Sequence, residues 1–366
     1  MADPAQSTAT AAAVTANPRS TTNPQQRFSD ALAGLFFVGP GMIVLFVFLI
    51  LPLLVALYFS FTNWSGTRPL DQPDAYEMVG FANYQRWIID GRRVDDFYRA
   101  VRNTLYYVIG VVPVQTALAL VLAAIVNQKW LRGKSFFRTA FYFPSITSSI
   151  VVSFIFLFLF SSGGPINTLI RAVNPGYVPI AWTTDNSGLG HLLLGQFGIV
   201  RDTLSPFIRN EVLGLELWEW IAGPSVALTT IMALAIWTTT GTMMVIYLSA
   251  LQGIPPSVYE AAQVDGATGW QQFRSITLPL LRPTTFFVVT LGLIGTFQVF
   301  DQIYVLQNDQ TARTTTSVAY LVYSTAFEGT SPNLAEASAI AIVLFLIIFV
   351  ATLLQRRFVG GDRAED

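Results

Sequence analysis

The sequence of 366 residues contains no cysteine and a single histidine, His191. The lack of cysteine excludes disulfide bonds, thiolate metal sites and cysteine nucleophiles. One imidazole gives no basis for a histidine metal site or a histidine charge relay. We therefore interpret His191 as a surface or packing residue, and we expect neither catalytic residues nor a metal site.

Charged residues are also scarce. They make up 12% of the chain, whereas hydrophobic residues make up 52%, and ordinary soluble domains carry about 25% charged residues. The net charge of -1 gives no basic footprint for nucleic acid. The phosphate-loop pattern G-x-x-x-x-G-K-[ST] does not occur, so the chain cannot cradle ATP phosphates in the usual way by itself. The composition indicates an integral membrane protein.

Long apolar segments define the predicted fold. A helix needs about 20 apolar residues to cross a hydrocarbon core of about 30 Å. The segments that reach this length are residues 35–61, 101–127, 137–160, 224–252, 284–306 and 334–355. The first is too long, and lacks a small-residue cleavage site, to be a removable signal peptide. We predict an all-α membrane protein with about six transmembrane helices over residues 35–358.

Two terminal segments fall outside the predicted membrane domain. Residues 1–34 are rich in Ala, Thr, Asn, Pro and Gln with little periodicity, which is typical of a flexible tail. Residues 359–366 form a second, shorter tail after the last apolar segment. We expect both tails to be cytoplasmic.

The connections between spans predict the orientation. Residues 128–138 contain four basic residues and no acid, and Arg356 and Arg357 directly follow the last span. The positive-inside rule places both regions in the cytoplasm. Segments 62–100, 161–223 and 307–333 then lie outside. Segment 62–100 carries five arginines against this rule, but it also carries six acids, as small polar caps often do.

The most informative segment is residues 260–283, EAAQVDGATGWQQFRSITLPLLRP, between the fourth and fifth spans. Pro255 and Pro256 favour the start of a short helix, because the first turn needs no amide donors. Gly266 permits the backbone to turn into a second short helix, and two small alanines let a partner approach closely. The fixed positions are Glu260, Ala261, Ala262, Gly266, Ile276, Leu278 and Pro279. We predict a docking element; the alternative is an interfacial helix that only links two spans.

This spacing resembles the cytoplasmic EAA coupling loop, here residues 253–283, of binding-protein-dependent ABC importer permeases. Over residues 35–358 the chain is similar to the carbohydrate branch of these permeases, of the maltose, multiple-sugar and glycerol-phosphate type, through segments such as VGFANYQRW, GGPINTLI and FQVFDQIYVL. The resemblance implies the type I importer permease fold with cytoplasmic coupling helices. It also implies a multi-pass protein of the prokaryotic plasma or inner membrane.

The partners implied by the resemblance are a second permease subunit, a pair of ATPase subunits and an extracytoplasmic solute-binding protein. The solute would be a sugar or a related polar molecule. The chain would not be an enzyme and would need no cofactor of its own, because ATP and magnesium would bind to the partner ATPase. Membrane lipid would surround the chain, and nucleic acid would not be a partner.

Within the coupling loop, the resemblance implies that the first short helix inserts into a groove on the ATPase. Glu260 would pair with or cap a polar group there, and Asp265 and Arg274 would add polar anchoring. An acid such as Asp265 can equally end local hydrogen bonding in a turn. The outer segment at about residues 183–222 is longer than usual in the family, and the resemblance implies no function for it.

Polar residues in the spans are candidates for the solute path, because they are costly unless they face protein or water. Hydroxyls, amides, carboxylates and aromatic rings are the groups that hold sugars. The candidates are Trp237, Thr238, Thr239 and Thr242 on one face of the fourth span, and Thr296, Gln298 and Asp301 near the outer end of the fifth. Membrane threonines also commonly bond within their own helix or to a neighbouring helix. We find no membrane-embedded Lys or Arg facing a path, which disfavours an acidic solute.

Three alternatives stay open. The same class of permease could carry glycerol phosphate or another polar solute that is not a sugar. A membrane-embedded transferase would need acids and cations clustered at one interface, and a scaffold would dock something other than an ATPase on the loop. Copurification of a phosphate-loop ATPase and a second permease distinguishes an importer from the last two classes.

Overall fold

A computed structural model describes residues 24–72, 74–89, 93–128, 130–199, 210–212, 215–328 and 332–359. The chain divides into two compact units, residues 1–55 and residues 56–366. Residues 1–23 and 360–366, which hold most of the predicted tails, lie outside the described residues. The backbone is already helical at Pro24, eleven residues before the predicted start of the first span.

The described part of the first unit, residues 24–55, is helical. Helix α1 covers Pro24–Leu45, and the π-helical turn η2 covers Phe46–Ile50. Helix α2, Leu51–Phe59, continues into the second unit. The turn η2 ends next to Pro52, which has no amide proton to donate, and π turns often accommodate such a missing bond. The stretch Leu32–Phe59 contains an 18-residue window with a mean hydropathy of 3.0 and is long enough to span a membrane.

Within the described residues, five helical stretches are long and apolar enough to cross a membrane, or six if one bent pair counts as a span. Beyond the first, they are α4 (Val94–Asn127), α10 (Val226–Gln252), α14 with α15 (Arg282–Phe297 and Asp301–Leu306) and α18 (Leu334–Val359). This confirms the prediction of an all-α fold with about six spans. A two-residue antiparallel pair, β1 (Glu211–Val212) with β2 (Leu215–Glu216), is the described strand structure.

The third predicted span, residues 137–160, is not one straight helix. It consists of α5 (Lys134–Ile146) and α6 (Ser149–Leu159), bent by 96°. Pro144 removes an amide donor from the last turn of α5, and Thr147 then adopts an extended conformation with ψ of 145°. The Thr147 hydroxyl donates to the carbonyl of Phe143 at 3.0 Å, which satisfies one of the open carbonyls at the helix end.

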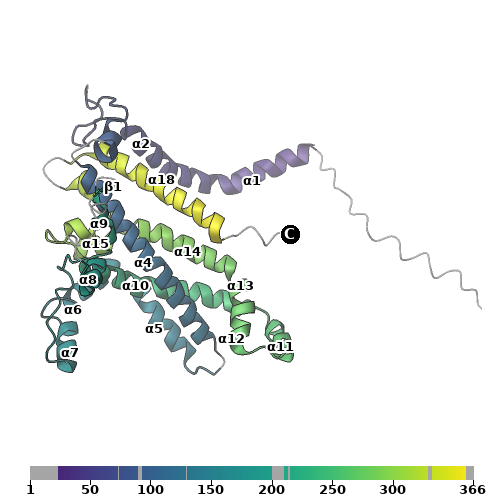
Figure 1. Ribbon diagram of the computed structural model, residues 1–366. Helices are drawn as coiled ribbons and strands as arrows, with labels where there is room; N and C mark the ends of the chain where they lie inside the picture. The colour runs from purple at the N-terminus through teal and green to yellow at the C-terminus, as the bar shows by residue number, and fades with distance from the viewer. Residues whose placement is uncertain are drawn as a thin grey trace, which may run out of the picture. The chain divides into compact units, whose positions relative to one another are not determined.

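Helix α10 lies at the centre of the second unit and packs against α4, α5 and α14 (Figure 1). Small residues allow the close approach. A Cβ atom added to Gly241 would lie 2.1 Å from the carbonyl oxygen of Phe141, and one added to Gly292 would lie 2.5 Å from Nε2 of Gln115. Close backbone contact through small residues is the usual way that helices associate in a membrane.

The segments predicted to lie outside gather at the end of the unit where α4 begins. They form α3 (Ala82–Tyr84), η3 (Gln85–Ile89), α7 (Pro165–Val173), α8 (Leu189–Gln196), α9 (Leu217–Ile221), α16 (Ala312–Thr315) and α17 (Val318–Phe327), together with β1 and β2. Asn186 accepts a bond from the Thr314 hydroxyl at 2.6 Å, which joins the long outer segment to α16. The Glu336 carboxylate accepts bonds from Arg86 and from the indole of Trp87, which join segment 62–100 to α18.

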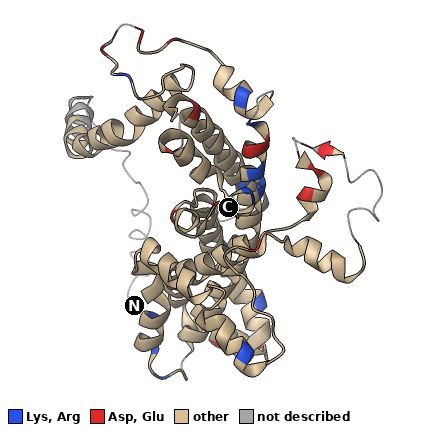
Figure 2. Ribbon diagram, turned by 90° about the vertical axis from the view of Figure 1, so that its left-hand side faces the viewer, with Lys and Arg blue, Asp and Glu red and all other residues tan. Residues whose placement is uncertain are grey.

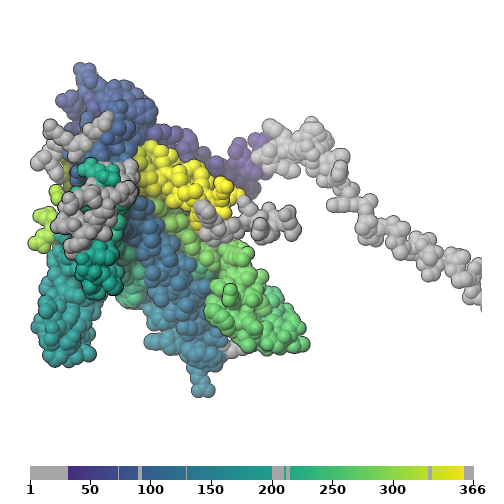
Figure 3. Space-filling model, in the orientation of Figure 1, coloured from purple at the N-terminus to yellow at the C-terminus, as the bar shows by residue number. Residues whose placement is uncertain are grey.

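The other end of the unit carries the short helices of the predicted docking loop. These are α11 (Pro256–Val264), α12 (Gly269–Gln272), η6 (Phe273–Thr277) and α13 (Leu278–Leu280). They form part of the green lobe at the lower right of Figure 3. Val126 near the end of α4 packs in one core cluster with Leu251 and Leu281, and Leu131 of the basic connection packs against this cluster. Figure 2 shows that most of the ribbon along the long helices is uncharged.

Candidate coupling site and solute path

The loop between α10 and α14 folds into two short helices joined by a tight turn, as the sequence predicts. Pro255 is the N-cap residue of α11 and Pro256 is its first residue. Helix α11 ends at Val264, and Gly266 has a φ of +78°. Only glycine adopts this left-handed conformation without strain. We refer to residues 256–272 as the coupling hairpin.

Backbone bonds fix the turn of the coupling hairpin. The amide of Ala267 donates to the carbonyl of Ala262 at 2.9 Å, and the amide of Gly266 donates to the carbonyl of Gln263 at 3.0 Å. This pair of bonds is the Schellman arrangement, which satisfies carbonyls at the end of a helix. Thr268 then begins α12 with a capping box, in which its amide donates to the Gln271 side chain at 2.7 Å.

The coupling hairpin presents apolar side chains to its surroundings. Val264 is 89% exposed and Trp270 is 68% exposed. Among the predicted loop residues, Glu260, Ala261, Asp265, Gly266, Arg274 and Pro279 are exposed, whereas Ala262, Ile276 and Leu278 are partly buried. A 3.0 Å hydrogen bond between the hydroxyls of Tyr259 and Thr277 joins α11 to η6, the part of the loop that follows the hairpin. The first helix and the turn are thus free to contact a partner, while the apolar residues after α12 anchor the loop.

Threonines of the fourth span differ in what their hydroxyls contact. The Thr238 hydroxyl donates to carbonyls of its own helix, Leu234 and Ala235. The Thr239 hydroxyl reaches the side chain of Gln115 on α4 at 2.5 Å. Thr242 is exposed, and its amide donates to the Ser145 hydroxyl of α5 at 3.2 Å.

The predicted path residues do not all lie in one cavity. Trp237 is half exposed, contacts Phe156 with the two rings tilted by 37°, and lines a cavity of about 400 Å³ between α4, α5 and α10. Gln298 lines a different cavity of about 520 Å³ between α14, α17 and α18. Thr296 is buried and donates to carbonyls of its own helix, and Asp301 is exposed at the start of α15.

Two polar or aromatic features of this region escape the sequence analysis. Gln115 is 1% exposed in the middle of α4, and an amide flanked on both sides by apolar turns is the signal that could have identified it. Phe300 and Tyr304 of the fifth span form an aromatic cluster with Tyr320 and Tyr323 of α17. Tyr304 is 47% exposed, so part of this cluster is open to a ligand.

Tyr320 is held as a hydrogen-bond donor in this cluster. Burial, followed by a hydrogen bond to Glu328, raises the pKa of Tyr320 to about 12. Its hydroxyl donates to the Glu328 carboxylate at 3.0 Å. The phenol therefore stays protonated at neutral pH, and the ring faces are the part of Tyr320 that remains for stacking.

The outer end holds a polar cavity of about 280 Å³ that the sequence analysis does not predict. Arg102, which lies within the predicted span 101–127, is buried and lines it. This cavity lies at the outer end of α4 and not on an identified solute path, so the expectation that no membrane-embedded Lys or Arg faces the path stays a prediction. The long outer segment closes this cavity, and its His191 ring stacks on Trp218 at 4.1 Å, as expected of a packing residue.

A polytopic helical protein with a projecting helical hairpin at one end and a polar cap at the other has the organisation of a membrane transport permease. The chain belongs to the family of binding-protein-dependent transport system inner membrane components, whose model matches residues 115–360. Multiple membrane-crossing helices and a transport role follow from this membership.

Curated relatives cover nearly the whole chain. The lactose transport system permease protein LacF of Rhizobium radiobacter is 29% identical over 333 residues, which are 90% of this chain and 94% of the relative. The multiple sugar-binding transport system permease protein MsmF of Streptococcus mutans is 31% identical over 320 residues, 87% and 92% of the two chains.

The fold is also found in a solved structure. A chain in the crystal structure of a bacterial ABC transporter involved in the import of the acidic polysaccharide alginate superposes with a TM-score of 0.65 and 22% sequence identity. The match covers 91% of this chain and 99% of that chain. The likeness confirms the ABC importer permease fold.

Proposed function

We propose that this chain is the permease subunit of an ATP-driven importer, and that the coupling hairpin is where an ATPase subunit docks. The observation that carries this proposal is the geometry of the hairpin. It leaves the turn at Gly266 open, with no atom within 4 Å of a Cβ placed there, and it exposes Val264 and Trp270. A linker helix lying in the membrane interface would not need a preformed left-handed turn.

Docking on this surface would be stabilised mainly by apolar burial. Complete burial of a valine or a larger side chain contributes about 1.5 to 3 kcal/mol, so Val264 and Trp270 together supply several kcal/mol. Glu260, Asp265 and Arg274 are exposed on the loop and would pair with polar groups of the partner. Because the chain has no phosphate loop, ATP and magnesium would bind to the ATPase subunits, and this chain would need no cofactor.

The orientation follows from the charges of the connections and is supported by the packing. The segments assigned to the outside contact one another, as in the bonds between Asn186 and Thr314 and between Arg99 and Glu219. At the other end, Leu131 and Phe137 of the basic connection pack with Leu251 and Leu281, which flank the coupling hairpin in the sequence. We infer that the hairpin and both termini are cytoplasmic, in the plasma or inner membrane of a prokaryote.

The solute is proposed to be a sugar or a related polar molecule delivered by an extracytoplasmic binding protein, through a path formed with a second permease subunit. The names of the relatives support this class, since they include lactose, multiple-sugar and arabinooligosaccharide permeases. Half-exposed Trp237 and Tyr304 would stack on sugar rings, and Thr242 and Asp301 would bond to sugar hydroxyls. Thr238 and Thr296 already bond within their helices, so they are weaker candidates.

Reconstitution tests the proposal. The full chain is copurified with its partners, inserted into liposomes with ATP inside or outside, and assayed with radiolabelled lactose, maltose and glycerol 3-phosphate. We expect uptake of a sugar that requires ATP on the side of the coupling hairpin. Uptake that is independent of ATP, or copurification without any ATPase, would contradict the importer function. Transport of glycerol 3-phosphate alone would contradict the sugar assignment only.

A further inference from the structure

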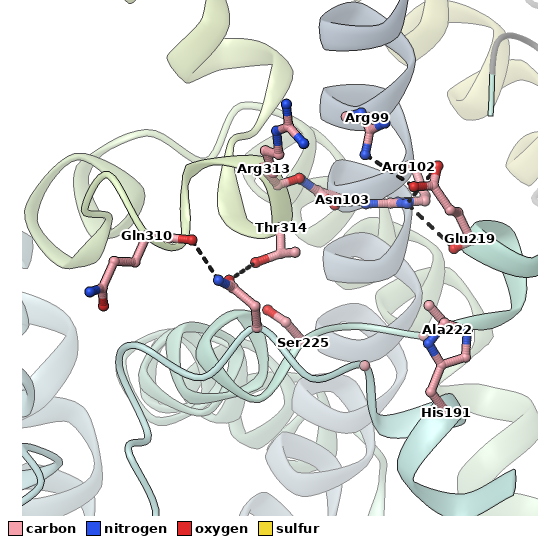
Figure 4. A pocket seen from close by; sticks show the side chains of 13 residues that line it. Arg99, Arg102, Asn103, His191, Glu219, Ala222, Ser225, Gln310, Arg313 and Thr314 are labelled. Carbon is pink, nitrogen blue, oxygen red and sulfur yellow. Dashed lines mark hydrogen bonds and ion pairs between the residues drawn. The ribbon is translucent and has the colours of Figure 1, made fainter. Parts of the chain in front are cut away.

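The polar cavity at the outer end is lined by groups of mostly one charge. Arg99 and Arg102 come from the first turns of α4, and Arg313 comes from α16. Glu219 of α9 is the acid among the lining residues (Figure 4). The guanidinium groups of Arg99 and Arg102 therefore lie beside this single carboxylate, and exposed Arg313 adds a third positive charge at the edge of the cavity. We refer to this cavity as the outer arginine pocket.

The resident carboxylate is shared between two arginines. Glu219 Oε1 accepts a bond from Nη1 of Arg99 at 3.2 Å, and Glu219 Oε2 lies 3.9 Å from Nη1 of Arg102. Figure 4 shows both arginines reaching Glu219 from one face of α4. Arg313 is exposed, and no acidic partner for its guanidinium is found in the described part of the chain. The arrangement leaves positive charge uncompensated.

Arg102 also has an unused donor. Its side chain is 7% exposed, and its Nε is buried without a hydrogen-bond acceptor among the described residues. A buried donor that lacks an acceptor is destabilising, and more so in a charged group. Nε has almost no accessible surface and does not itself open onto the cavity, so Arg102 contributes positive charge there.

The pocket is built by the long outer segment. A Cβ atom on Gly190 would lie 2.3 Å from the carbonyl oxygen of Ile221, so the backbone of α8 presses directly against the end of α9. The hydroxyl of Tyr106 donates to the carbonyl of Trp220 at 2.7 Å, which fixes α9 against α4. These contacts hold Glu219 beside the arginines and give the outer segment a role.

We propose that the outer arginine pocket binds a carboxylate group presented from the extracytoplasmic side. Planar guanidinium groups match carboxylates with paired, charge-assisted hydrogen bonds, and Glu219 already shows that the pocket accepts this group. A volume of about 280 Å³ holds one side chain or one sugar ring. The outward orientation rests on the proposed function, whereas carboxylate binding does not.

Two sources supply such a group at the outer face. One is a sugar acid, of which galacturonate is the simplest probe. The other is an aspartate or glutamate on the surface of the binding protein. Both use the same chemistry in the pocket, and uptake measurements distinguish them.

The first experiment measures binding of galacturonate to the full chain in lipid nanodiscs by isothermal titration calorimetry, with galactose as the neutral control. We expect saturable binding of galacturonate only. Arg313→Gln should weaken it about tenfold, equivalent to 1.4 kcal/mol, and Arg313 holds no side-chain bond within the described chain that its loss would break. Arg171→Gln, on exposed α7, is the matched control and should leave binding unchanged.

A variant that is expected to strengthen galacturonate binding excludes a purely structural role for the cluster. Glu219→Gln removes the resident carboxylate that competes for Arg99 and Arg102, so galacturonate should bind more tightly. If the cluster only stabilises the cap, both Arg313→Gln and Glu219→Gln would either leave binding unchanged or lower it. Equal binding of galactose, no saturable binding, or tighter binding of glycerol 3-phosphate than of galacturonate would overturn the proposal.

The reconstituted transporter then identifies the source. If the carboxylate belongs to the solute, Arg313→Gln lowers uptake of the sugar acid but not of a neutral sugar, and the binding protein docks normally. If it belongs to the binding protein, the variant weakens docking about equally with and without solute. A variant that changes neither docking nor uptake would overturn the proposal, whatever the outcome for ATP-dependent transport.

Discussion

The turn at Gly266 gives the sharpest prediction, because its cost can be worked from geometry alone. With φ at +78° and no atom within 4 Å of an added Cβ, Gly266→Ala meets backbone strain but no steric clash. A residue other than glycine pays about 1 to 2 kcal/mol in the left-handed region. The unbound loop can relax to another turn. The full strain energy of the left-handed conformation is therefore subtracted from the binding free energy when a partner requires the turn seen in this structure.

The expected effect is a weaker complex between the chain and its ATPase. A cost of 1 to 2 kcal/mol corresponds to about a 5- to 30-fold higher dissociation constant for Gly266→Ala. Gly266→Asn should fall between glycine and alanine, because asparagine adopts the left-handed conformation more readily. Gly266→Pro should abolish docking, since its φ is fixed near -65° and it lacks the amide that donates to Gln263.

The chain contains a matched control for this series. Gly133, in the basic connection at the same end of the unit, has a φ of +76° and likewise no atom within 4 Å of an added Cβ. Gly133→Ala carries the same backbone cost outside the coupling hairpin. Binding of the purified ATPase to full-length variants in nanodiscs is measured by biolayer interferometry. Equal loss of affinity for Gly133→Ala and Gly266→Ala, or weaker binding of Gly266→Asn than of Gly266→Ala, would refute the reasoning.

Two further predictions concern orientation and the solute path. The chain has no cysteine of its own, so an introduced cysteine reports its own position. A cysteine at exposed Gln128 should react only with reagents that enter the cytoplasm, and a cysteine at exposed Val178 should react with impermeant reagents added outside. The reverse labelling pattern would mean that the predicted topology is inverted. Thr239→Val removes the hydroxyl bonded to buried Gln115, so it should lower stability by about 1 to 3 kcal/mol in thermal unfolding. Thr242→Val should lower sugar uptake several-fold and leave the unfolding temperature unchanged, and unaltered uptake would remove Thr242 from the path.

The coupling hairpin could be predicted from the sequence because its determinants are local. Pro255, Pro256 and Gly266 set the start and the turn, and the capping residue Thr268 lies only three residues from its partner Gln271. Each of these acts through backbone geometry within a few positions. The number of spans was predictable for a similar reason, since apolar length alone decides it.

Two kinds of feature could not be predicted. One is where a helix ends within a continuous apolar run, and the other is a contact between residues far apart in the sequence. The bend between α5 and α6 was missed although Pro144 lies near it, because a continuous apolar run does not show where a helix ends. The outer arginine pocket joins Arg102 to Glu219, which lie 117 positions apart. The threonines of α10 have a common helical spacing, but only the neighbouring helices show that Thr239 bonds to a buried amide.

The most direct test of the docking role compares two valines that are equally exposed. Val264 ends α11 in the coupling hairpin and Val173 ends α7 in the outer region, and each is 89% exposed. An aspartate places the same charge at the end of a short helix in both cases. The measurement is solute-stimulated ATP hydrolysis by the reconstituted complex. Val264→Asp should remove most of the stimulated activity and release the ATPase from the membrane, whereas Val173→Asp should leave both unchanged. Full stimulated activity in Val264→Asp, with the ATPase still bound, would contradict the assignment of the hairpin as the ATPase docking site.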